Sequence, residues 1–249
     1  MISGHRIYDT HTHLGTARHS GRRWTVDDML RHMDAHGVDR SLLIPFPIVE
    51  DFRLAHDEIA AALSAARDRF SAAACLPVFI PEAEFRAEVR RCAELGFTAI
   101  KLQPQYHALN PVSHRSDFFF ETALENRMTV VAHTGSGAPF ALPALYIAPA
   151  RRFPDLRIVL GHAGGSVYYL ETIVAAETCP NIYIEFSSLM PHHILEILDR
   201  IPANRCLIGS DLPASVDAEI GKIVDLGITE SDKADILWNT AARLFDAAT

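Results

Sequence analysis

Short runs of apolar and β-branched residues alternate along this chain with longer stretches whose apolar positions recur every three or four residues. Several short runs, such as residues 41–44 and 158–160, are apolar almost throughout instead of alternating, which is typical of a strand covered on both faces. We therefore expect a parallel sheet. The runs predict eight strands, at residues 6–10, 41–46, 72–78, 98–102, 129–133, 157–160, 182–186 and 206–209.

The amphipathic stretches between these runs predict helices. The first helix opens at Thr25, with acidic residues in its first turn, and ends at Gly37. A glycine followed by an apolar residue also predicts the ends of two other helices, at Gly96 and Gly227. Further helices are predicted at residues 55–69, 82–95, 116–126, 142–152, 166–177, 193–200, 214–226 and 231–246.

Eight strands, each followed by a helix, within 249 residues specify a (β/α)8 barrel, also called a TIM barrel. A doubly wound open sheet is the alternative, but no glycine-rich phosphate-binding fingerprint follows the first strand. No linker or shift in composition divides the chain. We therefore expect a single α/β domain over residues 1–249.

Composition narrows the classes of partner. The net charge is −8 and no cluster of Lys and Arg is found, so nucleic acid is not an expected partner. No apolar stretch is long enough to cross a membrane, and the N-terminus lacks a secretory signal, so we expect a cytoplasmic protein that acts on a small molecule. The oligomeric state stays open, a homo-oligomer included. Four scattered cysteines are expected to be reduced and buried: Cys75, Cys92, Cys179 and Cys206.

The first predicted strand leads into Asp-Thr-His-Thr-His at residues 9–13. Regular alternation in a strand predicts that Asp9, His11 and His13 share one face, with Tyr8 on the opposite face. Neutral imidazole is a common ligand of zinc and related ions, and two imidazoles on one strand are held at a fixed separation. A surface histidine pair is the alternative for this segment taken alone.

Further metal-binding residue types lie at the ends of the later predicted strands. Lys101 ends the fourth strand and His133 the fifth, while His162 follows the sixth and Asp211 the eighth. Alone, either histidine could be a hydrogen-bonded core residue, and Asp211 could cap the following helix. Strand ends meet at one rim of a barrel, so the set predicts a metal site there. The remaining histidines, expected to be solvated or capping, include His32, His36, His56, His114 and His193.

Six segments resemble the amidohydrolase superfamily, specifically its amidohydrolase 2 type, which includes lactone hydrolases and non-oxidative decarboxylases. They follow the family order and extend over almost the whole chain. The matching segments are DTHTH at 9–13, AIKLQP at 99–104, VAHTG at 131–135, FPDL at 153–156 leading to GHAGG at 161–165, GSDLP at 209–213 and NTAARLF at 239–245.

The resemblance implies a metal centre and assigns its residues. His11 and His13 would be ligands, with His133 and Asp211 completing the set and His162 close beside it. Such a set leaves room for water, as catalytic sites require. Asp211 would take a proton from the attacking water and return it to the leaving group, while His162 would polarise the substrate oxygen or relay that proton. The expected cofactor is one divalent ion, zinc first, with manganese or iron as alternatives.

Two residues have more than one interpretation. In binuclear members of the superfamily, a lysine at the position of Lys101 is carboxylated and bridges two metals. The alternative is a free ammonium that pairs with a substrate carboxylate. Asp9 is expected either beside the ligand histidines, where a carboxylate fixes the tautomer, or in the floor of the barrel.

The resemblance favours a metal-dependent hydrolase that uses activated water to attack an ester, lactone or amide bond of a small carboxylated metabolite. A decarboxylase of the same family is the alternative, although those usually carry a longer insert after the first strand and often a proline after HxH, where this chain has Leu14. A metal-binding barrel without turnover is a third hypothesis. The candidate substrate contacts are Arg18, Arg22, Arg23, Arg53 and Tyr106.

Overall fold

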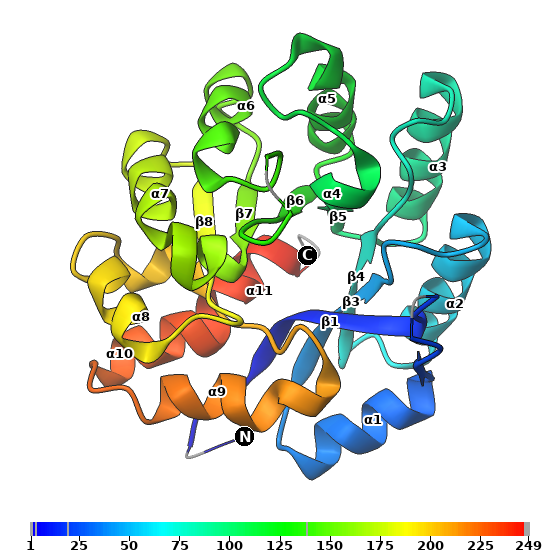
Figure 1. Cartoon of the computed structure of the whole chain (residues 1–249). Coiled ribbons are helices and arrows are strands. Elements are labelled where there is room, and N and C mark those ends of the chain that lie inside the picture. The colour runs from blue at the N-terminus through cyan, green and yellow to red at the C-terminus, as the bar shows by residue number, and fades with distance from the viewer. Residues whose placement is uncertain (1, 3, 19, 138, 247–249) are drawn as a thin grey trace.

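The computed structural model describes residues 2, 4–18, 20–137 and 139–246, and its strands curl into a barrel surrounded by helices (Figure 1). Within these residues the sheet has the order β2-β1-β3-β4-β5-β6-β7-β8-β9, and only the pairing of β2 with β1 is antiparallel. The strands are β1 (Tyr8–Thr16), β2 (Arg23–Trp24), β3 (Arg40–Pro45), β4 (Phe70–Ala74), β5 (Ala99–Leu102), β6 (Thr129–His133), β7 (Ile158–Gly161), β8 (Ile182–Glu185) and β9 (Cys206–Leu207).

Backbone hydrogen bonds close the barrel between its first and last strands. The Thr10 N–H donates to the Ile208 carbonyl at 3.0 Å, and the Asp211 N–H donates to the His11 carbonyl at 2.7 Å. An open sheet would leave these edges apart, so the predicted (β/α)8 barrel is confirmed and the doubly wound alternative is wrong.

The helices form a ring outside the strands, as Figure 1 shows. Most lie where periodicity predicts them, although α4 was not expected. The predicted C-terminal helix at 231–246 is divided by a π-helical turn, Asp235–Asn239. The helices are α1 (Val26–Ala35), α2 (Phe52–Ala65), α3 (Glu82–Glu94), α4 (Pro104–His107), α5 (Asp117–Glu125), α6 (Ile147–Arg152), α7 (Gly165–Thr178), α8 (Pro191–Leu198), α9 (Val216–Val224), α10 (Glu230–Ala234) and α11 (Thr240–Phe245).

Two apolar clusters stabilise this arrangement. The larger one fills the layer between the strands and the helices. The smaller one lies inside the barrel, where Leu42 and Ile44 of β3 meet Leu244 and Phe245 of α11. The C-terminal helix therefore plugs the end of the barrel opposite the strand C-termini, and it leaves only the other end free for a site.

Strand β1 contains a bulge that changes which side chains share a face. Asp9 pairs with Ser41 but Thr12 pairs with Leu43, so β1 advances three residues while β3 advances two. An extra residue reverses the alternation. Tyr8 consequently joins the interior cluster, and its predicted separation from the His11 face is wrong. The grouping of Asp9 with the histidines is wrong for the same reason.

Helix ends follow the sequence signals in most places. Thr25 and Asp28 form the reciprocal capping box of α1. Gly37 and Gly96 have φ of 68° and 93°, as the glycine-terminated ends require. Gly227 does not follow this rule, because α9 already ends at Val224 and the next residue, Asp225, has ordinary right-handed geometry.

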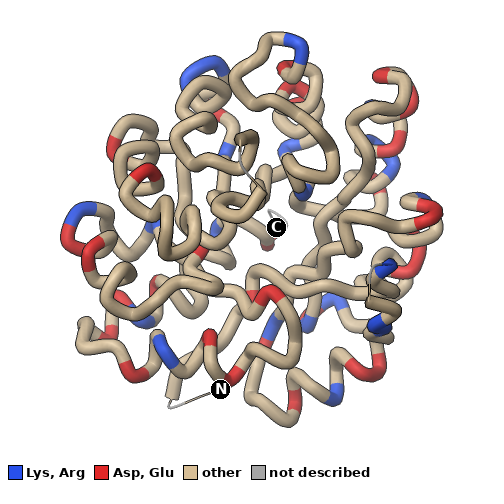
Figure 2. Tube along the Cα trace, viewed as in Figure 1, with Lys and Arg blue, Asp and Glu red and all other residues tan. Residues whose placement is uncertain are grey.

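Acidic and basic residues alternate along the outer helices in the view of Figure 2. All four cysteines are buried and unpaired, as predicted. Among the described residues, no helix combines the length and the apolar character needed to cross a bilayer.

Candidate metal centre and active site

The bulge of β1 directs His11 and His13 toward the open end of the barrel, where Asp211 meets them from the segment after β9. One Asp211 carboxylate oxygen lies 3.6 Å from His11 Nε2 and 3.7 Å from His13 Nε2. These three side chains offer ligand atoms that all lie within 4.8 Å of one another. The structure thus brings together donors from the start and the end of the chain.

Both imidazoles use Nδ1 for a second partner. His13 Nδ1 lies 3.3 Å from the Pro45 carbonyl, and His11 Nδ1 lies 3.1 Å from the Glu185 carboxylate. Since a carbonyl and a carboxylate only accept, each Nδ1 carries the proton and each Nε2 keeps its lone pair. Two imidazole lone pairs and one carboxylate oxygen are donors that suit a divalent transition-metal ion, so these residues fit the metal that the fold family implies.

Lys101 lies under this cluster. It is 2% exposed, and its Nζ donates to His11 Nε2 at 2.7 Å. One lone pair cannot serve both the ammonium and a metal ion, so an ion bound at His11 Nε2 would replace this hydrogen bond and leave Lys101 beside the metal-binding atoms. Burial lowers the pKa of Lys101 to about 8. Lys101 lines neither cleft at the open end of the barrel, which argues against direct pairing with a substrate carboxylate.

His162 and Glu185 form the other wall of the site. The His162 ring centroid lies 4.7 Å from that of His11, and its Nδ1 lies 2.7 Å from the Ser187 hydroxyl oxygen. Glu185 was not among the predicted site residues, yet it is fully buried at the end of β8 and contacts His11 and Ser187. Its sequence signal is a carboxylate at the end of an otherwise apolar predicted strand.

His133 stands apart from the three clustered donors. Its ring centroid lies 4.7 Å from that of His162, but its Nε2 donates to the Ser136 carbonyl at 2.7 Å. Only Nδ1 of His133 is therefore free to accept or to ligate in this arrangement.

Asp9 lies beside His11, as one of its two interpretations expected, but its carboxylate contacts the backbone and not the imidazole. Its carboxylate accepts hydrogen bonds from the Ser210 hydroxyl at 2.6 Å and from the Ser210 and His11 backbone N–H groups. It therefore ties β1 to the segment that carries Asp211, whereas Glu185 contacts the His11 ring. Burial raises the pKa of Asp9 to about 7.

Burial and neighbouring side chains together lower the pKa values of several groups at the site. Burial, and then the charge of Lys101, lower the pKa of His11 well below 6.5. Burial also lowers the pKa of His133 to about 4 and that of His162 well below its usual value. Burial alone would raise the pKa of Asp211, but its interactions with His13, His11 and His162 hold that pKa well below its usual range.

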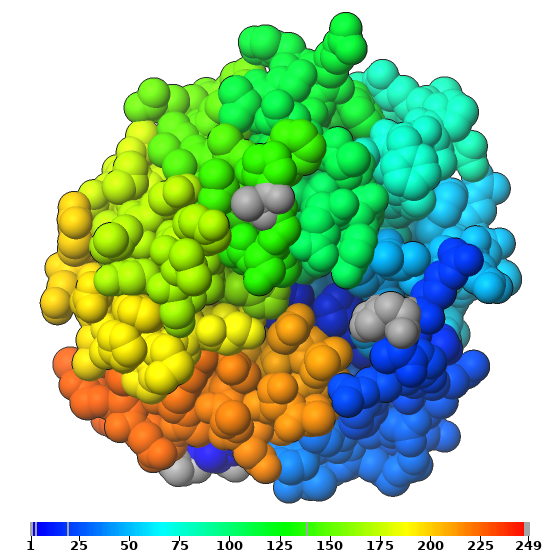
Figure 3. Space-filling view, viewed as in Figure 1, coloured from blue at the N-terminus to red at the C-terminus, as the bar shows by residue number. Residues whose placement is uncertain are grey.

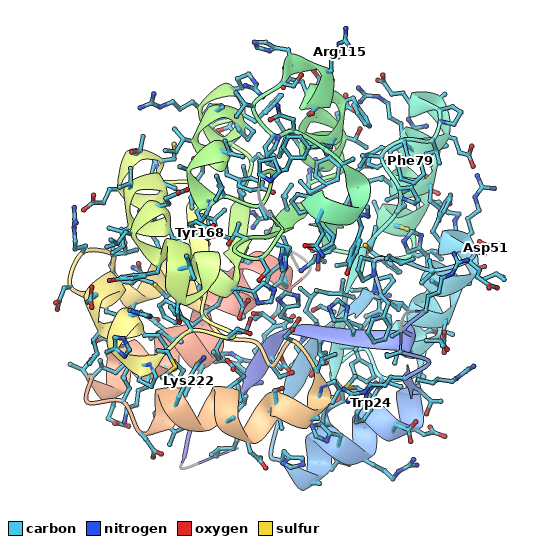
Figure 4. All side chains as sticks on the ribbon, viewed as in Figure 1. Trp24, Asp51, Phe79, Arg115, Tyr168 and Lys222 are labelled. Carbon is cyan, nitrogen blue, oxygen red and sulfur yellow. The ribbon has the colours of Figure 1, made fainter. Side chains whose placement is uncertain are left out.

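Two clefts meet at Asp211. The large cleft has a volume of about 620 Å³ and contains His133, His162 and Tyr168, the last at the first turn of α7 (Figure 4). The small cleft, of about 310 Å³, contains His13, Arg22, Phe46, Gln103 and Tyr106. In Figure 3 the dark-blue start of the chain is visible at the bottom of a hollow between the green and orange segments.

Left-handed backbone conformations concentrate at this rim. His162, Ala163 and Asp211 have φ of 65°, 48° and 62°, although none is glycine. Such conformations are strained and persist only where the surrounding structure enforces them, as happens at functional sites. A Cβ on Gly135 would lie 2.9 Å from the Gly164 backbone, so glycine is required where these two cleft loops touch.

The residues predicted to contact substrate lie in different environments. Arg22 and Tyr106 line the small cleft, whereas Arg23 pairs with Glu58 and Arg53 with Glu84.

The expectation that His56 is solvated is wrong, because it is fully buried. Its Nδ1 lies 2.7 Å from the Glu88 carboxylate, and its Nε2 accepts from the Cys75 N–H at 3.0 Å. A helical histidine gives no sequence signal for such a pair, since the Glu88 partner comes from the next helix.

Comparison with known proteins identifies the family of this chain. The amidohydrolase family model matches residues 8–247, so the chain belongs to the amidohydrolase family of enzymes, as the sequence resemblance predicted. No curated protein matches the chain.

Solved structures with the same fold are distant in sequence. A 2,6-dihydroxybenzoate decarboxylase from Rhizobium has 18% identity and a TM-score of 0.78, over 97% of this chain and 98% of that one. A dihydroxybenzoic acid decarboxylase from a Polaromonas species, solved with manganese and 2-nitroresorcinol, has 16% identity and a TM-score of 0.77, over 97% of each chain. A probable 2-pyrone-4,6-dicarboxylic acid hydrolase from Acinetobacter baumannii, solved with citric acid, has 16% identity and a TM-score of 0.72, over 96% and 99%.

Proposed function

We propose that this enzyme is a metal-dependent hydrolase that attacks an ester, lactone or amide bond of a small carboxylated molecule. One observation carries the proposal. The Asp211 side chain is 39% exposed, lies within 3.7 Å of two imidazole Nε2 atoms, and borders both clefts. An ionised carboxylate that faces solvent and the metal-binding atoms together suits the proton transfers of hydrolysis.

His11, His13 and Asp211 would hold the ion, with His162 and His133 as further candidates. Zinc is the expected ion because the donors are mainly imidazole, and manganese is the alternative, as found in a relative of the same fold. A bound divalent ion supplies Lewis acidity that lowers the pKa of a water molecule to about 7.

The proton transfers belong to the side chains. The Asp211 carboxylate accepts the proton of the attacking water and returns it to the leaving group, which departs toward one of the clefts. His162 borders the large cleft beside Asp211, where it relays the proton or joins the ion's ligands.

The small cleft supports a substrate that carries a carboxylate. Arg22 contributes a guanidinium to its wall, and Phe46 and Tyr106 offer apolar surface for the body of the molecule. Gln103 also lines this cleft, and its buried Oε1 has no hydrogen-bond partner among the described residues, so it is available to accept a hydrogen bond from a substrate.

Isotope labelling tests the reaction class. The protein, loaded with zinc or with manganese, is incubated in ¹⁸O-water with a panel of carboxylated lactones, esters and amides, followed by mass spectrometry. We expect one solvent oxygen in the product of each turnover. Release of carbon dioxide without entry of solvent oxygen contradicts the hydrolase proposal.

Decarboxylation is the second candidate. It is favoured by the shared fold with two decarboxylases of hydroxylated benzoic acids, although the identity of 16–18% carries no more than the fold. The same panel, extended with such acids and monitored for carbon dioxide, tests it directly.

A further inference from the structure

Glu185 accepts four hydrogen bonds although it is completely buried. Its Oε1 accepts from the Ser187 N–H at 2.6 Å. Its Oε2 accepts from the Ser187 hydroxyl at 2.8 Å, the His162 N–H at 3.0 Å and His11 Nδ1 at 3.1 Å. Four donors satisfy the capacity of one ionised carboxylate, so Glu185 has no need of a further partner.

These contacts fix the direction of each hydrogen bond. A carboxylate can only accept, so the single hydroxyl proton of Ser187 is committed to Glu185. The Ser187 oxygen must then accept from His162 Nδ1, 2.7 Å away. His162 consequently carries its proton on Nδ1 and presents an Nε2 lone pair.

His11 reaches the same state by direct contact. Its Nδ1 donates to Glu185, and its Nε2 accepts from the Lys101 ammonium at 2.7 Å, which independently requires an unprotonated Nε2. The His11 and His162 rings come from different strands, yet their centroids lie 4.7 Å apart. One carboxylate therefore orients two imidazoles.

We propose that Glu185 is a positioning residue that sets the tautomer of both imidazoles, His11 directly and His162 through Ser187, so that both present Nε2 lone pairs to the metal site. The inference rests on the proposed function, because that function identifies the ligand as a divalent ion. It also decides between the two functions considered for His162. A neutral ring with its proton on Nδ1 accepts a proton or binds the ion, and it does not donate a hydrogen bond to a substrate oxygen.

The tautomers are measured by ¹⁵N-imidazole NMR on metal-free protein, which is independent of turnover. We expect His11 and His162 to carry the proton on Nδ1 in the wild type. Glu185→Gln should disturb both rings, because in either orientation the amide NH₂ faces hydrogen-bond donors. These donors are the Ser187 N–H at one position, and the Ser187 hydroxyl, the His162 N–H and His11 Nδ1 at the other. Ser187→Ala should release His162 alone, and Ser187→Thr, which restores a hydroxyl, should restore the tautomer of His162.

Metal affinity gives a second readout. Zinc binding is measured by competition with a chromophoric chelator, and Glu185→Gln should weaken it by about 10–100-fold, the usual effect of losing a partner of a ligand imidazole. Glu196→Gln is the matched control, since Glu196 is a carboxylate of the outer helix α8 that accepts a hydrogen bond from the Tyr169 hydroxyl at 2.7 Å. It should bind zinc like the wild type.

The outcomes separate this inference from the proposed function. Unchanged tautomers and wild-type zinc affinity in Glu185→Gln would overturn the role of Glu185. If Glu185→Gln does not fold by circular dichroism, the Ser187 pair decides, because an Nδ1–H tautomer of His162 that survives Ser187→Ala also overturns it. A wild type with the expected tautomers but without hydrolysis supports Glu185 and contradicts the hydrolase.

Discussion

Asp211 combines metal-binding geometry with exposure to both clefts, so its substitution should affect chemistry more than folding. We expect Asp211→Asn to lower kcat/KM by at least about 100-fold, since the amide can neither accept the proton nor balance the charge of an ion. The melting temperature should change little, because the side chain is 39% exposed. Steady-state kinetics and thermal unfolding measure the two effects, and near-normal turnover in this variant would end the proposal that Asp211 is the base.

Substitution of Lys101 tests how many metal ions the site holds. The proposed site holds one divalent ion, and Lys101 contacts His11 without lining a cleft. Elemental analysis should therefore find one ion per chain in the wild type and in Lys101→Gln, with KM changed by less than about threefold. A fall from two ions to one would instead indicate a carboxylated lysine that bridges two metals.

For single residues, the sequence predicts well which side chains belong to the site. It predicts poorly which other side chains they contact. His11, His13 and Asp211 could be found because each lies beside a strand end, and the barrel brings strand ends to one rim. Glu185 also lies near the end of a predicted strand, but its role depends on residues that follow two other strands. The burial of His56 depends on Glu88, which lies in a different helix.

At the scale of elements, the contact of β9 with β1 makes Gly209 essential. A Cβ at this position would lie 2.4 Å from the His11 Cβ and 2.6 Å from the His11 backbone nitrogen. Gly209→Ala should therefore push the two strands apart, displace His11, and destabilise the fold by at least about 1–3 kcal/mol. Urea unfolding and zinc affinity should both report the change.

Gly221 provides the matched control. It lies within α9, and a Cβ there would meet nothing within 4 Å. Gly221→Ala should raise the free energy of unfolding by about 0.5–1 kcal/mol, because alanine is the better helix former. Equal effects of the two substitutions would contradict the view that backbone contact between β9 and β1 sets the geometry of the site.

The order of the elements follows from periodicity, but details of their geometry do not. The bulge in β1 cannot be predicted from its own residues, because it depends on the register with β3. The division of the C-terminal helix likewise depends on how Ile236 and Leu237 pack under the barrel. Local patterns predicted where helices begin, as at Thr25, because the capping partner lies three residues away.

At the scale of the whole molecule, acid should weaken the fold through Glu88. Burial alone would raise the pKa of Glu88, but hydrogen bonds from His56 and Arg91 lower it from 4.5 to about 2. The unfolded chain then binds more protons than the folded chain, so the free energy of unfolding should fall as pH decreases from 4.5 toward 2. Urea unfolding at a series of pH values measures this. Glu88→Gln should flatten the decline, and an unchanged slope would contradict the assignment.

Removal of the ion should also lower global stability. An ion that binds only the folded state stabilises it by about 2.7 kcal/mol at a free concentration of 100 times Kd. For a chain of this length that corresponds to roughly 2–4 °C in melting temperature per kcal/mol. Chelation should thus lower the melting temperature of the wild type and leave that of His11→Ala unchanged. A chelator effect of the same size in both proteins would place the ion elsewhere.

The hydrogen bonds that join Thr10 and His11 to the segment around Asp211 have a consequence for biosynthesis. The ribosome releases His11 and His13 long before Asp211. A nascent chain therefore exposes an incomplete donor set, and the proposed ion could not bind with full affinity until the segment after the last strand docks beside the first. Loading of that ion would thus follow the closure of the barrel.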